Sequence, residues 1–363
     1  MKEGFASVDC AAPPTQPLDA KRRPAEPAFA ALDLGSNNCR LLVGTPAGEG
    51  FRVVDSFSRI VRLGEGLQHT GRLSEPAMAR TLTALKVCAA RLHRRPVRAL
   101  RAIATDACRR AVNGEEFLAR VRAETGLPID VISTREEAEL ALESCAPLLE
   151  AAPGQIGRRA LLFDIGGGST ELAWVRLSDR APPCLIGYVS LPVGVATLSE
   201  RYGARGFEAE GFEAMVADVS ERLAAFGSLH CIAQEVRQGG VRLLGTSGTV
   251  TTLAGMVLGL ERYNRALIDG TVLTRLSAEQ ALEDLQALGR DGLMRHPCAG
   301  PERVDFVLPG CAIYAAIHRL WPAEEVVVAD RGLREGMLLR MIRADRARKG
   351  SPAASPPGLR RAR

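Results

Sequence analysis

A glycine-rich segment at residues 161–175, LLFDIGGGSTELAWV, carries residue types that bind phosphate and cations. Its apolar ends predict two strands joined by a tight turn, although three glycines also occur in simple hairpins. Glycine has no Cβ, so the N–H groups of the turn can fold around an anion without steric cost. The carboxylates Asp164 and Glu171 frame the turn and are placed to hold a hydrated divalent cation or to orient a water molecule. The predicted phosphate-binding residues are Gly166, Gly167, Gly168 and Ser169.

A related segment stands at residues 28–44, AFAALDLGSNNCRLLVG. An apolar strand again ends in an aspartate, Asp33, and a polar turn leads into a second apolar strand. Asp33 therefore corresponds to Asp164, and the predicted phosphate-binding residues of this turn are Gly35, Ser36 and Asn37. A duplicated strand–turn–strand unit predicts two similar domains that face each other across a cleft, with one phosphate-binding turn from each.

The composition bounds the class of protein. With 363 residues, of which 46% are apolar and 25% charged, the chain is long enough for two domains with cores of their own. No apolar run reaches the ~20 residues of a membrane span, and the N-terminal residues lack the apolar core of a signal peptide. Nine cysteines without a C-x-x-C pair indicate reduced thiols. We therefore expect a cytoplasmic protein without a membrane partner.

The net charge of +5 is concentrated at one end of the chain. Residues 343–363 hold seven Lys or Arg residues and one Asp, whereas the opposite charges of residues 1–27 cancel. We expect both segments to be disordered, because they lack apolar periodicity. The remainder is close to neutral, so no nucleic-acid partner is expected.

Between these ends, helical and extended periodicities alternate, which indicates an α/β protein. We expect one domain at 28–136, joined by the last helix at 332–342, and a second domain at 137–331. A long amphipathic helix is predicted at 208–235, with a break near Gly227. Thr134 and Glu137 have the spacing of a capping box, so a helix is expected to begin there.

Several ordered motifs resemble a known family. The segments DLGSNN (33–38), DIGGGSTE (164–171), GTSGT (245–249) and DRGLREGML (330–338) are similar to the phosphate and nucleotide motifs of the actin-like ATPase superfamily. Together with ATDACRRA (104–111) and STREEAEL (133–140), they resemble the Ppx/GppA family of exopolyphosphatases and guanosine pentaphosphate phosphohydrolases. The resemblance covers about residues 28–342 and matches the short, two-domain form. It implies two actin-like (ribonuclease H-like) α/β domains that face each other across a cleft.

The resemblance also implies an activity, namely Mg²⁺-dependent removal of the terminal phosphate of polyphosphate or of guanosine pentaphosphate. It places the general base at Glu137 and a phosphate-binding arginine at Arg109. Both phosphate turns would clasp the substrate, and Gly248 would line the cleft from the glycine-rich loop of the second domain. Polyphosphate is slightly favoured, because the sequence has no clear purine-binding signature. The residues expected to position Mg²⁺, mostly through water, are Asp33, Asp164 and Glu171.

Some of these residues have plainer interpretations. Glu137 alone would be the capping-box residue of its helix, and its neighbour Glu136 is the obvious alternative base. Arg109 and Arg110 point to different faces of a helix, so one of them is expected to reach the cleft. Arg40 and Arg62 either add positive potential or are solvated surface groups. Gly332 and Gly336 are interpreted as sites of close helix packing.

Two other functions remain open at this stage. A phosphotransferase of the actin-like superfamily, such as a small-molecule kinase, would depend on ADP or ATP, but the motifs around Arg109 and Glu137 argue against it. A non-catalytic sensor of alarmones or polyphosphate would be attractive if Glu137 or Glu171 were missing, and both are present. The family resemblance also allows a homodimer.

Overall fold

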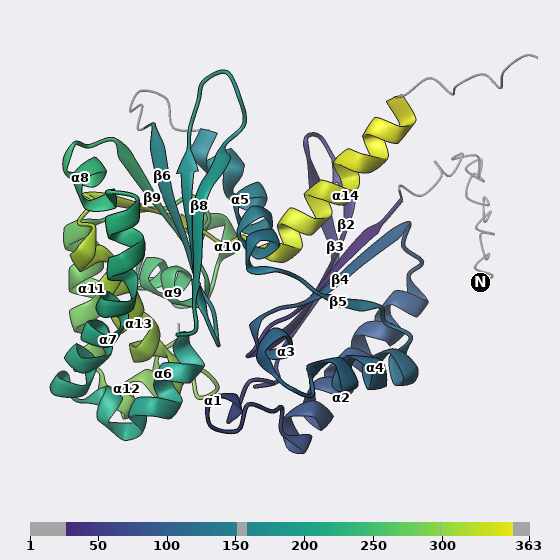
Figure 1. The fold of residues 1–363 in the computed structure, drawn as a ribbon, viewed down its shortest axis with the longest axis horizontal. Helices are drawn as coiled ribbons and strands as arrows, with labels where there is room; N and C mark the ends of the chain where they lie inside the picture. The colour runs from purple at the N-terminus through teal and green to yellow at the C-terminus, as the bar shows by residue number, and fades with distance from the viewer. Residues whose placement is uncertain (1–26, 151–157, 298, 351–363) are drawn as a thin grey trace, which may run out of the picture.

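The computed structural model describes residues 27–150, 158–297 and 299–350. The predicted disordered segment therefore lies outside the described residues except for Pro27, and so do residues 351–363 of the predicted tail. Strands and helices alternate along the chain, as the periodicity predicts. The chain forms two α/β domains, which stand side by side in Figure 1 with the first domain in purple and blue.

The first domain is built on a five-stranded sheet with the order β3-β2-β1-β4-β5. Strands β1, β2 and β3 are antiparallel neighbours, whereas β4 and β5 run parallel to β1. Its strands are β1 (Phe29–Leu34), β2 (Asn38–Ala47), β3 (Gly50–Ile60), β4 (Ala99–Ala104) and β5 (Ile129–Val131). Its helices are α1 (Leu67–Thr70), α2 (Glu75–Arg94), α3 (Asp106–Arg110) and α4 (Gly114–Thr125).

The second domain repeats this topology. Its sheet has the order β8-β7-β6-β9-β11, with β10 added at the edge, and β6, β7 and β8 are again antiparallel. The strands are β6 (Arg159–Ile165), β7 (Thr170–Arg176), β8 (Cys184–Leu191), β9 (Val241–Thr246), β10 (Val272–Thr274) and β11 (Glu325–Ala329). The helices are α6 (Val195–Tyr202), α7 (Ala209–Leu229), α8 (Ile232–Arg237), α9 (Gly248–Val257), α10 (Arg265–Ile268), α11 (Arg275–Ala287), α12 (Gly289–Arg295) and α13 (Val304–Leu320), with a 3₁₀ turn at Gly203–Phe207. The predicted pair of actin-like domains is confirmed by this shared topology.

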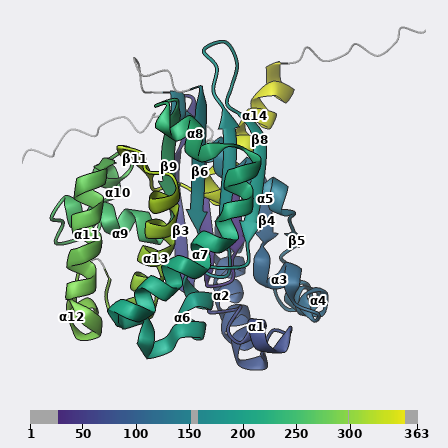
Figure 2. The ribbon, with the colours of Figure 1, turned by 60° about the vertical axis from the view of Figure 1, so that its left-hand side comes forward.

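Two helices lie between the sheets (Figures 1 and 2). Helix α5 (Thr134–Glu150) packs on the second sheet, and α14 (Leu333–Gly350) packs on β1, β2 and β3 of the first sheet. The two helices also pack on each other. At their crossing a Cβ on Gly336 would lie 2.2 Å from the carbonyl oxygen of Leu140, so only glycine fits there. Gly332, by contrast, has open space around it and makes no such contact.

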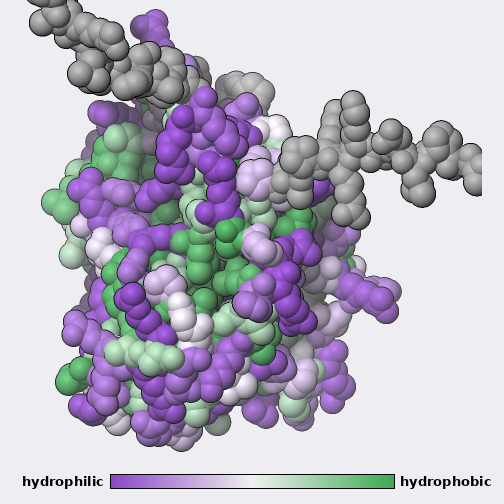
Figure 3. Space-filling model, turned by 90° about the vertical axis from the view of Figure 1, so that its right-hand side faces the viewer, coloured by the Kyte–Doolittle hydropathy of each residue, from purple (hydrophilic) through white to green (hydrophobic). Residues whose placement is uncertain are grey.

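Three apolar clusters hold these layers together. One joins the outer helices α2 and α4 to the first sheet, and another joins α7, α9 and α13 to the second sheet. The third lies in the middle, where residues of both sheets pack around α5 and α14. The side of the molecule that carries the first domain is mostly polar, with an apolar area near its centre (Figure 3). Within the described residues, no helix is long and apolar enough to cross a membrane.

Some predicted bounds were wrong. The last helix continues to Gly350, so residues 343–350, predicted as part of a disordered tail, are helical. This extension is fixed by ion pairs such as that of Arg343 with Glu143. The break predicted near Gly227 in the helix at 208–235 is confirmed, since α7 ends at Leu229 and α8 begins at Ile232; Gly227 itself packs closely on Trp321. The predicted domain boundary between residues 136 and 137 falls inside α5.

Candidate active site

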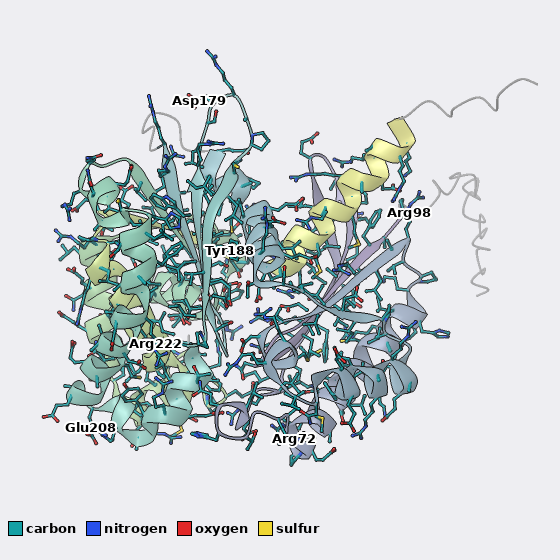
Figure 4. The ribbon with its side chains drawn as sticks, in the orientation of Figure 1. Arg72, Arg98, Asp179, Tyr188, Glu208 and Arg222 are labelled. Carbon is teal, nitrogen blue, oxygen red and sulfur yellow. The ribbon has the colours of Figure 1, made fainter. Side chains whose placement is uncertain are left out.

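A cavity of about 790 Å³ lies between the two domains. Both glycine-rich turns and the first turns of α9, α13 and α14 line it, whereas Arg98, Asp179 and Arg222 lie at the periphery (Figure 4). Arg109 does not line the cavity but contacts Glu137, which does. The sequence-predicted residues brought together in the lining are Asp33, Gly35, Ser36, Asn37, Glu137, Asp164, Gly166, Gly167, Gly168, Ser169, Glu171 and Gly248.

The turn after β1 offers backbone donors to a ligand. The carbonyl oxygens of Ser36 and Asn37 accept hydrogen bonds from Gly64 N and Val61 N, each at 2.8 Å, so they are fixed away from an anion. Within the described residues, the N–H groups of Ser36 and Asn37 have no acceptor, although both residues are buried. Buried N–H groups without an acceptor are rare in proteins. These two are therefore available to an anionic ligand.

The turn after β6 is built in the same way. The carbonyl oxygens of Gly166 and Gly167 accept hydrogen bonds from Val195 N (3.0 Å) and Ala196 N (2.9 Å), at the start of α6. The N–H groups of Gly167 and Gly168 have no acceptor in the described part of the chain. Each domain thus contributes a turn whose carbonyls are occupied and whose N–H groups are not, which is the arrangement of an anion-binding nest.

The two turns touch each other across the cleft. A Cβ added to Gly167 would lie 2.6 Å from the Cβ of Asn37. One added to Gly168 would lie 2.5 Å from the hydroxyl oxygen of Ser36 and 2.7 Å from a carboxylate oxygen of Asp106. Any side chain in the middle of the second turn would therefore push the domains apart. The glycines serve close approach as well as anion binding.

Hydrogen bonds and helix geometry fix the positions of Ser169, Glu171 and Gly248, three further residues of the predicted site. The hydroxyl group of Ser169 donates to Glu171 Oε1 at 2.5 Å, and that of Ser190 donates to the same oxygen at 2.8 Å. Ser169 thus orients Glu171, and its phosphate-binding role stays a prediction. Gly248 begins α9, whose N-terminus faces the cavity, and Ser247 caps that helix through a hydrogen bond from Thr249 N.

Four carboxyl groups in the cleft have raised pKa values. Asp164 and Glu171 are partners across β6 and β7. Burial, reinforced by the neighbouring Asp33, raises the pKa of Asp164 to about 6. Burial and the charge of Asp164 raise the pKa of Glu171 to about 7, against the hydroxyl groups of Ser169 and Ser190. Burial also raises the pKa values of Asp33 and Glu137, the latter further through the charge of Glu171.

Glu137 is buried, with 7% of its surface exposed, and does not cap its helix. The N-cap is Ser133, whose hydroxyl group accepts from Glu136 N at 3.1 Å, so the predicted capping pair of Thr134 and Glu137 was wrong. The side chain of Glu137 instead accepts a hydrogen bond from Arg109 Nη1 at 3.1 Å. Glu136 pairs with Arg101 and does not line the cavity. The register of the helix thus directs Glu137, and not its neighbour, into the cleft.

Arg109 contacts the predicted base directly. Besides Glu137, its Nη1 donates to the carbonyl oxygen of Ile132 at 2.9 Å, which fixes the guanidinium between β5 and α5. Arg110 pairs with Asp106 at 3.3 Å. Arg109 Nη2 also lies 4.0 Å from Asp106 Oδ1, so both arginines approach this carboxylate, and of the two Arg109 is the one paired with Glu137. A phosphate contact of Arg109 remains a prediction, while its contact with Glu137 is direct.

The carboxylates fit a hydrated cation. Within the described residues, no group of three or more His, Cys, Asp or Glu side chains could hold a metal ion directly. Asp33 Oδ1 is nevertheless buried without a hydrogen-bond partner, and its pKa and those of Asp164 and Glu171 are raised. A divalent cation with water ligands would satisfy this oxygen and favour the charged carboxylates. The donor types and charges of these residues therefore fit a hydrated divalent cation held through water.

We expect the free energy of unfolding in EDTA to fall as the pH rises from 5 to 8. Carboxyl groups with raised pKa values favour the folded state only while they are protonated, and Glu171 and Asp164 lose their protons near pH 7 and 6. The rise of the Glu171 pKa alone corresponds to roughly 3 kcal/mol. Urea unfolding across this pH range would measure the slope. Glu171→Gln should make the dependence of the unfolding free energy on pH less steep, and added Mg²⁺ should stabilise the protein most at pH 8. A stability that rises with pH in EDTA would contradict the prediction.

The structure decides between the alternatives left open for two arginines and adds cavity residues that the sequence did not single out. Arg40 lines the cleft and adds positive potential there, while Arg62 lies over the ring of Phe306 across the cleft. Arg334 lines the cavity from the first turn of α14. It belongs to the segment at 330–338 that resembles the superfamily motif, but the sequence does not reveal which residues of that segment face the cleft. Tyr263 also lines the cavity, with no recognisable motif around it.

Comparison with known proteins agrees with this geometry. The family model for the Ppx/GppA phosphatase family matches residues 43–345. The chain is 31% identical over 327 residues to a guanosine-5'-triphosphate,3'-diphosphate pyrophosphatase from Photobacterium profundum, an alignment that covers 89% of this chain and 61% of the relative. The chain thus spans about three-fifths of the length of that relative.

Solved structures of the same family have the same fold. A crystal structure of the Aquifex aeolicus member of the Ppx/GppA family superposes with a TM-score of 0.70 at 25% identity, covering 88% of this chain and 98% of the other. An exopolyphosphatase from Cytophaga hutchinsonii superposes with a TM-score of 0.76 at 22% identity, covering 87% and 98%, and shows the fold alone. The family match, the relative and the topology agree with the motifs in the cleft, and the chain belongs to the Ppx/GppA phosphatase family.

Proposed function

We propose that this protein is a Mg²⁺-dependent hydrolase that removes the terminal phosphate from a phosphoanhydride chain. One observation carries the proposal: two turns with unoccupied N–H groups meet across the cleft, and the buried carboxyl group of Glu137 lines the same cavity. Such turns suit phosphate oxygens, whose charge must be held before a water can attack. Family membership supports the same reaction class.

The side chains divide the work in a definite way. In this proposal Glu137 accepts a proton from the attacking water, and Arg109 holds its carboxylate in position. Ser169 and Ser190 hold one oxygen of Glu171, which leaves the other for the hydration shell of a cation. When bound, Mg²⁺ would neutralise phosphate oxygens near Asp33, Asp164 and Glu171. The N–H groups of both turns bind the phosphate that is transferred to water.

Two substrates suit the cavity, inorganic polyphosphate and guanosine pentaphosphate. The arginines of the lining favour a polyanion of either kind. The lining also includes, however, the aromatic residues Tyr263 and Phe306 and the acidic residue Glu302. An aromatic ring offers stacking to a base, and a carboxylate accepts hydrogen bonds from the N–H groups of guanine. These residues support guanosine pentaphosphate as a substrate beside polyphosphate, although the sequence slightly favoured the latter.

Phosphate release from both substrates, measured in parallel with and without Mg²⁺, tests the proposal. We expect turnover of at least one substrate, and its loss in EDTA. Tight binding of either substrate without turnover would replace the hydrolase by a sensor. Phosphate transfer that depends on ADP or ATP, in place of hydrolysis, would identify a kinase of the same superfamily.

A further inference from the structure

The first turn of α14 places an arginine in the lining of the cleft. Arg334 is the second residue of this helix, which leaves the second domain after β11 and covers the first sheet. Its side chain is 21% exposed and lines the cavity between the domains. The guanidinium is therefore largely removed from bulk water while it remains accessible to a molecule in the cleft.

Arg334 has no hydrogen-bond acceptor among the described residues. The nearest carboxylate oxygen is Glu335 Oε1, 3.9 Å from its Nη2, beyond hydrogen-bond distance. The carboxylate of Glu335 is already occupied, because it accepts from Arg265 Nη2 at 3.2 Å and from Gly332 N at 3.0 Å. A buried guanidinium with five unused donors is costly unless a ligand supplies acceptors.

A neighbouring arginine of the same loop shows the contrast. Arg331 also lines the cavity, but its Nε donates to Asp269 Oδ1 at 3.1 Å and its Nη2 donates to Asp269 Oδ2 at 2.8 Å. This fork-to-fork pair ties the start of α14 to the loop before β10, which is a structural role. Arg334, three residues along, lacks such a partner. The two residues thus have different functions although both face the cleft.

Burial and neighbouring positive charge oppose the cation at this position, whereas the charges of Glu335 and Asp33 favour it. The N-terminus of a helix carries partial positive charge, so an arginine in the first turn is unfavourable without an anion nearby. A second arginine, Arg40 on β2, also lines the cavity and disfavours the charge on Arg334. Arg40 likewise has no hydrogen-bond or ion-pair partner in the described residues. Asp33 lies within electrostatic range of both, but its Oδ1 accepts no hydrogen bond.

We infer that Arg334, together with Arg40, binds the phosphate chain of the substrate in the cleft. The inference rests on the proposed phosphoanhydride substrate. Phosphate oxygens would accept from both guanidinium groups, and Arg is suited to this because its planar fork contacts two oxygens at once. The chain would lie between these arginines and the two glycine-rich turns. Substrate binding would then remove the electrostatic cost that the empty cleft imposes on α14.

The experiment is a calorimetric titration of inorganic tripolyphosphate in Mg²⁺ buffer. It compares Arg334→Gln and Arg334→Lys, each made in the Glu137→Gln background to suppress turnover. The matched control is Arg340→Gln on the same helix, where the arginine is exposed and pairs with Glu143 on the surface. We expect Arg334→Gln to weaken binding at least about tenfold. The affinity of Arg334→Lys should lie between those of the parent and of Arg334→Gln, because lysine keeps the charge but lacks the planar fork of donors. The control Arg340→Gln should bind tripolyphosphate as tightly as its parent.

Thermal unfolding of the same variants separates a binding role from a structural one. Because Arg334 has no hydrogen bond to lose among the described residues and its ion pair with Glu335 is long, Arg334→Gln should have the Tm of its parent or a higher one. A lowered Tm would identify a structural role and overturn the inference, and so would unchanged tripolyphosphate affinity. Arg40→Gln provides a second test and should weaken binding as well. Titration of orthophosphate tests whether the arginine belongs to a site for a single phosphate. If Arg334→Gln weakened the binding of orthophosphate but not that of tripolyphosphate, the inference would also be overturned.

Failure of this inference is distinguishable from failure of the proposed function. If the protein with Glu137 intact hydrolyses neither substrate, but tripolyphosphate binding still depends on Arg334, the hydrolase proposal fails and the binding site stands. If hydrolysis occurs and Arg334→Gln binds tripolyphosphate as tightly as its parent, the opposite conclusion follows.

Discussion

Replacing Glu137 by glutamine is expected to lower kcat at least about 100-fold, with little change in KM. General-base catalysis contributes about 10²- to 10⁴-fold, and the amide cannot accept the proton of the attacking water. Because Glu137 is buried and has a raised pKa, its carboxylate should be more basic than an exposed one. Steady-state phosphate release at saturating substrate measures the effect.

The chain provides a closely matched control in Glu136→Gln. This residue is the immediate neighbour of Glu137 in α5, but it pairs with Arg101 and lies outside the cavity lining. Its replacement should leave kcat within about twofold, because surface ion pairs contribute little. Equal losses in the two variants would assign the effect to the helix and not to a base. Full activity of Glu137→Gln would remove Glu137 from the mechanism.

Replacing Gly167 by alanine should lower kcat/KM by about 100-fold, with a much smaller effect on the Tm. The new Cβ would stand 2.6 Å from the Cβ of Asn37, and neither atom can move without its backbone. The turns must therefore separate by about 1 Å, a misplacement that can cost about 10²-fold in rate. Stability should change little, because each domain keeps a core of its own. Kinetics and thermal unfolding of the same preparation measure both.

Gly50→Ala serves as the control for this variant. Gly50 lies in the hairpin between β2 and β3, and a Cβ there would approach nothing closer than 3.9 Å. It should retain the activity of the parent protein. If Gly167→Ala were equally active, the contact between the two turns would not belong to the catalytic conformation.

Sequence reasoning located the two turns because their chemistry is local. A strand that ends in aspartate, followed by residues with small side chains, specifies both a backbone shape and a donor set within a few positions. The duplication then predicted the two domains, and the shared sheet order confirms them. The position of Glu137 in the cleft also followed from a motif, although its expected cap was wrong: Ser133 and Thr134 are both good N-caps, and the sequence does not choose between them.

The remaining features depend on contacts between distant parts of the chain. The carbonyls of Ser36 and Asn37 are occupied by the segment after β3, and no local pattern predicts that pairing. Arg331 and Arg334 look alike in sequence, yet one is tied to Asp269 and the other is not. Such differences arise only when α14 returns from the second domain to the first. They could not be read from spacing alone.

The position of α14 at the end of the described chain affects how the first domain folds during synthesis on the ribosome. The first sheet is complete once β5 has been translated, but the helix that covers its inner face, α14, is the last described element of the chain. Until then the buried side chains of Phe29, Ala31 and Leu42 on that face lack their final cover. The nascent first domain therefore exposes apolar surface throughout translation of the second, a state that is prone to aggregation and suited to chaperone binding. Folding of the N-terminal half is thus completed by the C-terminal helix, after both halves have been made.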